Sequence, residues 1–188
     1  KNDMIYEIME NDSFEIISNV TWSSGHRHWR NIYHYGNNNG ERAPAMWLYP
    51  RFERNWILHF RIRTNRNHND GFNLVVPKEF RTWNNPHEIK VRVTKLYDDN
   101  KIQIDGFVNG KKAGSYTING AKLDNLKGRN LYVKNPWGKM DGYSVNSLIF
   151  RKTEEISEKE RELEKSIDDV EDDIKDIQEV VNKLEGGL

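Results

Sequence analysis

The stretch HEIKVRVTKLYDDNKIQIDGFVNGKKAGSYTI, His87 to Ile118, decides the fold. Apolar residues alternate with polar ones over Ile89–Val93 and again over Ile102–Ile104, and Ala113–Ile118 forms a returning segment. A period of two places one side of a strand in the core and the other in solvent. Asn109-Gly110 supplies the positive φ angles that a two-residue hairpin needs. The stretch therefore predicts an antiparallel meander of three strands.

Other short segments with strand patterns lie on both sides of this meander. They are Trp29–Gly36, Ala45–Tyr49, Ile57–Thr64, Phe72–Val76, Leu131–Val133 and Ser147–Phe150. Asn2–Ser18 predicts two short strands around a turn at Glu10–Ser13. About ten short strands, with turn signals every 8–12 residues and no alternation of strands with helices, predict an all-β sandwich.

Alternation also predicts which side chains share a face of a strand. In Trp29–Gly36, one face holds Trp29, Asn31, Tyr33 and Tyr35, and the other holds Arg30, Ile32 and His34. In Ile57–Thr64, one face holds Ile57, His59, Arg61 and Arg63, and the other holds Leu58, Phe60, Ile62 and Thr64.

The net charge of zero hides an asymmetry along the chain. Residues 154–188 contain 14 acidic and 5 basic residues, which leaves 15 acidic and 24 basic residues for 1–153. These two segments therefore have opposite net charges and are expected to have different roles. The absence of cysteine excludes disulfides and thiolate metal sites. No apolar run approaches the ~20 residues of a membrane helix, so no membrane span is predicted.

From Glu154 onward the hydrophobic period changes. Apolar residues recur at spacings of three and four, which is typical of a coiled-coil helix. The central positions of the seam are Leu163, Ile167, Val170, Ile174, Ile177, Val181 and Leu184. Either this helix self-associates, or it docks on a partner or on the basic part of its own chain, because acidic flanking positions would meet in a homomeric coil. The predicted organisation is a β-sandwich over residues 1–152 and an acidic amphipathic helix over 153–188.

The meander also carries a resemblance to a known family. With its Phe107–Lys111 turn FVNGK, it resembles the concanavalin A-like lectin/glucanase superfamily, and within it the laminin-G-like branch. LYVKNPWGKMDGYSVNSLIF, Leu131–Phe150, resembles the closing segment of that family. WRNIYHYGNNNGERAPAMWLYP, Trp29–Pro50, looks like a variant found in lectin-like domains of structural proteins of large DNA viruses. The resemblance covers residues 1–152 and implies a concanavalin A-like jelly-roll β-sandwich.

Sugar binding requires an aromatic face for C–H contacts and polar side chains for hydroxyls. Three predicted loops, Asn65–Gly71, Arg81–Pro86 and Asn135–Tyr143, offer both. The candidate ligand-binding residues in them are Asn67, Asn69, Asp70, Trp83, Asn84, Asn135 and Trp137. The other tryptophans, Trp22, Trp29, Trp47 and Trp56, are expected to fill the core, because large aromatics are highly buried on average.

Other chemistries have weaker support. The glucanase branch carries its acids as E-x-D-x-x-E on one strand. In this chain that spacing occurs at Glu10–Glu15, which includes the predicted turn at Glu10–Ser13, so no catalytic residue is assigned. Asn65–Gly71 resembles a calcium loop, but Asp70 is its only acid, and no metal ligand or cofactor is assigned. The basic residues are spread along the chain with no recognition motif, so nucleic acid is not a predicted partner.

The sequence therefore predicts a non-catalytic, lectin-like module that recognises a glycan or a protein surface, in a virion or on an extracellular surface. Its helical tail would mediate homo-oligomerisation or binding to a partner helix. Two alternatives stay open: a purely structural, capsid- or cement-type protein without sugar binding, and an enzyme acting on polysaccharide.

Overall fold

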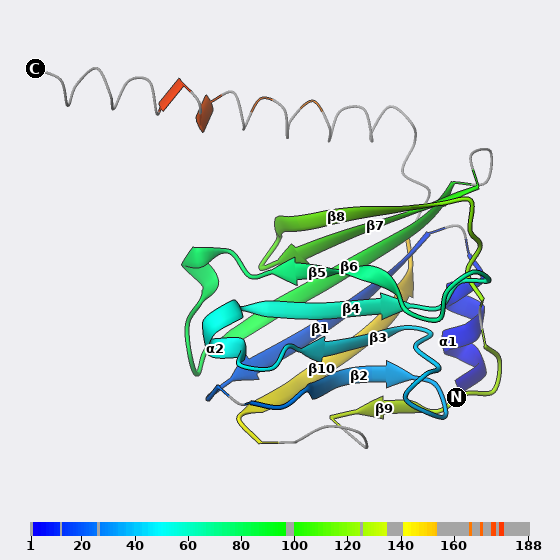
Figure 1. Ribbon diagram of the computed structural model, residues 1–188, viewed down its shortest axis with the longest axis horizontal. Coiled ribbons are helices and arrows are strands. Elements are labelled where there is room, and N and C mark those ends of the chain that lie inside the picture. The colour runs from blue at the N-terminus through cyan, green and yellow to red at the C-terminus, as the bar shows by residue number, and fades with distance from the viewer. Residues whose placement is uncertain are drawn as a thin grey trace, which may run out of the picture. The chain divides into compact units, whose positions relative to one another are not determined.

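The predicted meander forms three of the five strands of one of two sheets and includes one edge of that sheet (Figure 1). In this computed structural model, β6 (Pro86–Leu96), β7 (Lys101–Val108) and β8 (Lys111–Asn119) pair antiparallel in sequence order. Asn109 and Gly110 join β7 to β8 with φ angles of 50° and 81°, as a two-residue hairpin of this kind requires. The prediction of three consecutive antiparallel strands is confirmed.

The structure describes residues 2–11, 13–25, 27–96, 100–124, 126–134 and 141–153, together with 166, 170, 174, 175, 177 and 178. The remaining elements, in chain order, are α1 (Asn2–Met9), β1 (Ser13–Trp22), β2 (Arg30–Tyr35), β3 (Ala45–Leu48), α2 (Phe52–Asn55), β4 (Ile57–Ile62), β5 (Asp70–Val75), the 3-10 turn η1 (Lys78–Phe80), β9 (Leu131–Val133) and β10 (Tyr143–Lys152).

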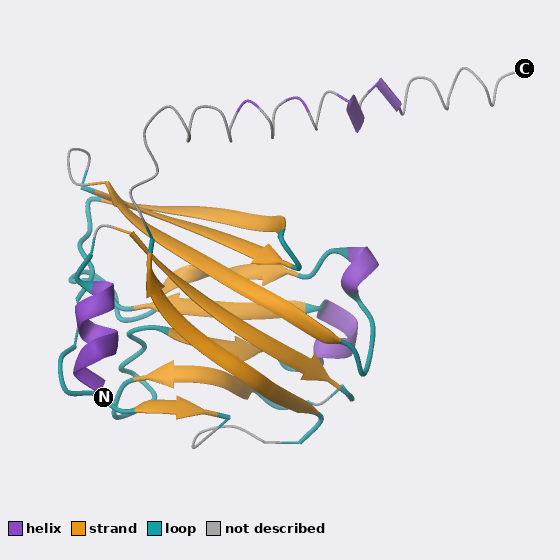
Figure 2. Ribbon diagram, turned by 180° about the vertical axis from the view of Figure 1, so that it is seen from behind, coloured by secondary structure: helices purple, strands orange, loops and turns teal. Residues whose placement is uncertain are grey.

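Two five-stranded antiparallel sheets lie face to face (Figures 1 and 2). The back sheet has the order β10-β1-β6-β7-β8, and the front sheet, nearer the viewer in Figure 1, has the order β5-β4-β3-β2-β9. Most neighbouring strands are consecutive in sequence, but β1 pairs with both β10 and β6, and β2 pairs with β9, across long connections. The two antiparallel layers confirm the prediction of a β-sandwich.

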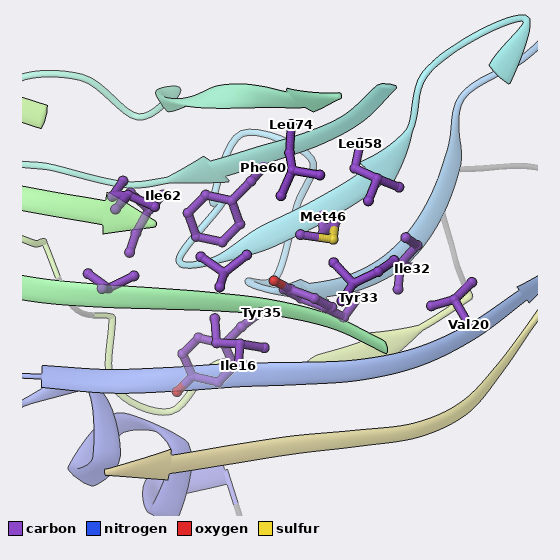
Figure 3. Packing of buried hydrophobic residues seen from close by; sticks show 14 of the residues in the cluster. Ile16, Val20, Ile32, Tyr33, Tyr35, Met46, Leu58, Phe60, Ile62 and Leu74 are labelled. Atoms are coloured by element: carbon purple, nitrogen blue, oxygen red, sulfur yellow. The ribbon is translucent and has the colours of Figure 1, made fainter. Parts of the chain in front are cut away.

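The core fills the space between the two sheets. Met46, Leu58, Phe60 and Leu74 of the front sheet point toward the back sheet, where Ile16 belongs to the same cluster (Figure 3). All five side chains are at most 1% exposed. Alternation explains the pattern, since β4 buries Leu58, Phe60 and Ile62 and leaves the residues between them half-buried on the outside.

The N-terminal segment differs from its prediction. Instead of two short strands, the segment forms α1 followed by the long strand β1. Ile5 and Met9 of α1 are buried, and Ile8 packs against the core. This spacing of three and four residues is helical, and it places one apolar side of α1 on the sandwich. The prediction of the first short strand is wrong because Ile5, Ile8 and Met9 follow a helical period, whereas the second strand is confirmed as the start of β1.

The chain divides into two compact units, Lys1–Thr153 and Glu154–Leu188. In the second unit the described residues are helical, and among them Val170, Ile174 and Ile177 are 55%, 55% and 63% exposed. The other seam residues, Leu163, Ile167, Val181 and Leu184, lie outside the described residues. The heptad helix therefore stays a prediction. Over the described positions, no helix has the length and apolar character to cross a bilayer.

Candidate functional site

The outer face of the front sheet carries a row of polar and aromatic side chains. Trp47 on β3 lies opposite His59 on β4, and His59 lies opposite Asn73 on β5. Arg61, two residues after His59, lies on the same side, as the predicted face of Ile57–Thr64 requires. Because the inner face of these strands is apolar, their outward positions are free to carry functional groups.

The strand β2 does not follow the predicted alternation. Asn31 lies opposite Trp47 and Tyr33 opposite Met46, so the register shifts between Asn31 and Tyr33. This irregularity is a β-bulge, which inserts one residue and turns the following side chains to the other face. Tyr33 and Tyr35 consequently lie in the core. The prediction that Asn31, Tyr33 and Tyr35 share one face is wrong for this reason.

The start of β2 is anchored in the interior. Arg30 is fully buried, and its Nη1 donates a hydrogen bond to the carbonyl oxygen of Ser24 at 2.8 Å. Its guanidinium lies 5.6 Å from the centre of the Tyr143 ring, and the Tyr143 hydroxyl donates to the carbonyl oxygen of Asn31 at 2.5 Å. These contacts fix the position of Trp29, the residue immediately before β2.

Trp29 is exposed, in contrast to its predicted place in the core. It retains 37% of its surface, whereas Trp22 and Trp56 are buried in the core as predicted. Trp47 is also buried, but it lies on the outer face of the sheet and not in the predicted core. The Trp29 ring centre lies 4.8 Å from those of Tyr49 and His59, in an edge-to-face arrangement with each. The predicted burial of Trp29 is wrong because the residue precedes the strand and packs on the outer face of the sheet.

Trp29 stands at a hollow in this outer face. The hollow has a volume of about 360 Å³. Its lining residues, which define the outer-face hollow, are Trp29, Asn39, Arg42, Trp47, His59 and Asn69. The indole Nε1 of Trp47 is buried and has no hydrogen-bond partner among the described residues. A buried donor without a partner is rare in proteins, and it indicates a position where a ligand atom would satisfy the donor.

A hydrogen-bond network sets the state of His59. Its Nδ1 lies 2.8 Å from Oδ1 of Asn73, which also accepts a bond from Nη2 of Arg61 at 3.3 Å. Burial lowers the pKa of His59 to about 4, the hydrogen bond to Asn73 opposes this, and the charges of Arg61 and Arg42 add to it. His59 is therefore neutral at neutral pH, with a proton on Nδ1 and an acceptor at Nε2.

Two turns hold the polar side of the hollow together. Nη1 of Arg42 donates to Oδ1 of Asn69, and Nε of Arg42 donates to the carbonyl oxygen of Asn39 at 3.1 Å. Gly71, two residues after Asn69, has a φ of +132°, and a Cβ atom at this position would lie 2.4 Å from the carbonyl oxygen of Phe60. Glycine is needed at this point, because only its bare backbone allows β5 to approach β4 this closely.

Other predicted candidates of the Asn65–Gly71 loop line a second hollow. This β8 hollow, of about 520 Å³, is lined by Arg66, Asn67, Asp70, Tyr116, Thr117, Ile118, Asn119 and Ala121. Several of its polar groups already bond to other protein groups. Asp70 accepts hydrogen bonds from the Thr64 hydroxyl and from Nδ2 of Asn67, and Arg66 donates to the carbonyl oxygen of Asn119 at 2.9 Å.

The loop that holds Trp83 and Asn84 lies at the opposite end of β5 from Asn67, Asn69 and Asp70. Trp83 is half-buried and packs on Trp56, with ring centres 5.0 Å apart. Asn84 is exposed, has a φ of +61°, and donates its backbone N–H to the carbonyl oxygen of Trp22 at 2.8 Å. The two loops therefore do not form one site. Asn135 and Trp137 lie outside the described residues.

Among the predicted ligand-binding residues that the structure describes, only Asn69 lines the outer-face hollow. Sequence reasoning missed Trp29, Asn39, Arg42, Trp47 and His59. The alternation of Ile57–Thr64 was the one sequence signal that could have identified His59, because it places this side chain on the outer face of its strand. No group of three or more His, Asp or Glu side chains suited to a metal ion occurs within the described part of the chain.

No family model matches this chain, and no curated protein matches it. Among solved structures, it resembles the binding domain of botulinum neurotoxin DC in complex with rat synaptotagmin II, with 15% identity, a TM-score of 0.51 and coverage of 88% of this chain and 38% of the other. The botulinum neurotoxin serotype C1 binding domain is 14% identical, with a TM-score of 0.48 and coverage of 82% and 36%. The heptameric SAP-like pentraxin from Limulus polyphemus is 12% identical, with a TM-score of 0.46 and coverage of 76% and 66%.

This chain spans less than two-fifths of the length of the first of these structures. At 15% identity the likeness concerns the fold alone. The chain therefore shares a jelly-roll β-sandwich fold with the toxin binding domain.

Proposed function

We propose that this protein is a non-catalytic carbohydrate-recognition module of the concanavalin A-like kind, and that the outer-face hollow is its binding site. The observation that carries the proposal is the exposed ring of Trp29 beside buried and half-buried hydrogen-bonding groups. A sugar ring needs this combination, because its C–H face packs on an aromatic ring while its hydroxyls need donors and acceptors. The volume of about 360 Å³ falls in the range of small-molecule sites.

The polar groups of the hollow differ in how far they are already satisfied. Nε1 of Trp47 is an unused donor. Neutral His59 offers an acceptor at Nε2, since its Nδ1 is bonded to Asn73. Oδ1 of Asn69 is taken by Arg42, which leaves the amide nitrogen of Asn69 as a donor. In the β8 hollow, Asp70 and Arg66 already bond to neighbouring protein groups.

Recognition without catalysis fits the lining of the hollow. Glycoside hydrolysis depends on a pair of carboxyl groups that flank the scissile bond. None of the six lining residues is an Asp or a Glu. The jelly-roll fold shared with a toxin binding domain is compatible with a binding role, although fold by itself does not set function.

Replacing Trp29 with alanine is expected to abolish glycan binding. The change removes the exposed aromatic face, and loss of a central aromatic contact in a binding site commonly costs at least ~2 kcal/mol, or about thirtyfold in affinity. The measurement is a glycan array with the parent chain, followed by titration of the strongest ligand with each variant. Trp29→Phe should keep much of the affinity, because it keeps an aromatic face.

Tyr116→Ala is the matched control, since Tyr116 is 41% exposed and lines the β8 hollow instead. It should bind as the parent does. Binding that is lost in Tyr116→Ala and kept in Trp29→Ala would move the site to the β8 hollow and contradict the proposal. A parent chain that binds no glycan on the array would remove the carbohydrate function altogether.

We further propose that residues 153–188 mediate self-association. The heptad spacing supports this, and Val170, Ile174 and Ile177 are helical residues with exposed apolar side chains. Light scattering of the full chain should give the mass of a dimer or trimer, and Ile174→Glu should reduce it to one chain, because a charge enters the apolar seam. A monomeric mass for the parent would contradict self-association and favour docking on another partner. The setting in a virion or on an extracellular surface stays a prediction.

A further inference from the structure

Arg42, which lines the outer-face hollow, and Arg61, beside His59 on the same face, have no acidic partner among the described residues, unlike several arginines elsewhere in the sandwich. Arg63 pairs with Asp124, and Arg129 lies 3.0 Å from Glu41. Arg42 and Arg61 form no such ion pair within the described residues. Their hydrogen bonds go to carbonyl and amide oxygens: Asn39 and Asn69 for Arg42, and Phe60, Phe72 and Asn73 for Arg61.

Partial burial of these guanidinium groups is unfavourable without a negative charge nearby. Burial lowers the pKa of Arg42, and burial together with the charge of Arg42 lowers the pKa of Arg61. The hollow therefore holds positive charge that no acidic side chain in the described part of the chain neutralises locally. An anion bound there would be stabilised by both cations, and it would find Arg42 in the lining itself.

The acidic residues next to the lining in sequence have other partners. Glu41 lies beside Arg129 and accepts a hydrogen bond from the backbone N–H of Asn37 at 2.8 Å. Asp70 accepts from the Thr64 hydroxyl and from Asn67. Neither is among the lining residues of the outer-face hollow. The interior of the hollow thus has one exposed aromatic ring, several donors and an excess of positive charge.

We propose that the ligand of the outer-face hollow is an acidic sugar, whose ring packs on Trp29 and whose anionic group pairs with Arg42. This inference rests on the proposed carbohydrate function and adds the charge of the ligand to it. Guanidinium binds carboxylate and sulfate with similar hydrogen-bond geometry, so both anionic groups belong to the class. A neutral sugar leaves the charge of Arg42 and Arg61 uncompensated and is expected to bind more weakly.

Three matched sugars test the proposal: methyl glucoside, methyl glucuronide and methyl glucoside 6-sulfate. Each is titrated into the full chain while the indole N–H signals of the six tryptophans are followed by NMR. At least one acidic sugar should bind at least tenfold more tightly than the glucoside, as expected for a charged hydrogen bond. The two acidic sugars distinguish carboxylate from sulfate recognition. Added salt should weaken their binding and leave that of the glucoside unchanged.

Arg42→Gln should reduce the affinity for the acidic sugars to that for the glucoside. Arg66→Gln is the matched control, because Arg66 comes from the neighbouring turn and lines the β8 hollow. It should behave as the parent does. Unshifted signals of buried Trp22 and Trp56 in the free variants would confirm that the fold is intact.

Each contrary result has a separate meaning. Equal affinities for the three sugars, with all binding lost in Trp29→Ala, would overturn the anionic preference and leave the carbohydrate site in place. Acidic-sugar binding that survives in Arg42→Gln and is lost in Trp29→Ala would also overturn this inference alone. If no sugar shifts any indole signal and a poly-glutamate peptide does so through Arg42, both the acidic-sugar inference and the carbohydrate function fail.

Discussion

Replacing Glu15 with alanine is expected to lower the free energy of unfolding by about 3 kcal/mol, because it removes a buried charge from a paired cluster. Glu15 lies on β1 and is 1% exposed. Its carboxylate lies 3.7 Å from Lys90, 3.0 Å from Arg92 and 2.6 Å from Arg151. Without it, three cations on neighbouring strands face one another with no central negative charge. Their partial exposure allows some rehydration, which keeps the loss at the lower end of the range for buried pairs.

The same carboxylate predicts a dependence on pH. Burial raises the pKa of Glu15, but hydrogen bonds from Arg151 and Arg92 and the charges of Lys90 and Arg92 outweigh burial and hold the pKa below 4.5. A carboxyl group with a lower pKa in the folded state stabilises the fold fully above its unfolded pKa, and this stabilisation is lost as the pH falls through the folded pKa. The difference in stability between the parent and Glu15→Ala should therefore be constant near neutral pH and shrink below pH 4.5.

Urea and thermal unfolding of both proteins, followed by circular dichroism over a pH series, measure these differences. The melting temperature should fall by roughly 6–12 °C at neutral pH, given the usual relation for domains of this size. Glu79→Ala is the control, because Glu79 also pairs with a lysine, Lys111 at 2.7 Å, but at the exposed surface. It should change stability little. A Glu15→Ala protein as stable as Glu79→Ala would contradict the role assigned to the cluster.

Replacing Trp22 with alanine is expected to cost about 4 kcal/mol of stability, as for other large aromatics removed from a core. Trp22 is fully buried at the end of β1, and its ring stacks on His87 with centres 4.2 Å apart. Phe52 and Trp56 pack against it at 5.1 Å and 6.1 Å. Its Nε1 also donates to the carbonyl oxygen of Thr82 at 2.6 Å. The substitution therefore leaves a cavity and removes the shorter of two contacts to the Thr82 carbonyl oxygen, which also lies 3.3 Å from Nε2 of His87.

Thermal and urea unfolding would measure this loss beside two comparison variants. Trp22→Phe keeps most of the packing and removes the hydrogen bond, so a smaller loss of about 1 kcal/mol is expected from that bond. Trp29→Ala removes an exposed tryptophan and should leave stability close to that of the parent. The assignment of Trp22 to the core and Trp29 to the surface would be wrong if the two alanine variants unfolded at the same denaturant concentration.

Local pattern was sufficient for much of the sandwich. The alternation in β6 and β7 and the Asn109-Gly110 turn predict paired antiparallel strands because each depends on residues close in sequence. The strand prediction for the region of α1 was wrong because two periods compete there. Ile5, Ile8 and Met9 have helical spacing, but the segment also contains residues that are common in strands. In β2 a single bulge reversed the faces after Asn31, and nothing local marks a bulge of this kind.

The candidate site was much harder to predict. The composition of its polar loop predicted Trp83 as a binding residue, but Trp83 packs on Trp56. The exposed aromatic ring at the site is that of Trp29, which precedes a strand. Asn69 was identified because it lies in an asparagine-rich loop. Its partner Arg42 lies 27 residues away in sequence, and only the folding of two turns over the front sheet brings them together.

The sequence by itself determined an all-β sandwich built around an antiparallel meander, because alternation and turn chemistry act over a few residues. It also determined the division of charge between residues 1–153 and the acidic remainder. Only the tertiary structure decided which tryptophan is exposed, which strand faces point outward and which polar groups stay unpaired. Those outcomes depend on strand register and on contacts between residues far apart in the chain. The outer-face hollow is formed by such contacts, as between Arg42 and Asn69.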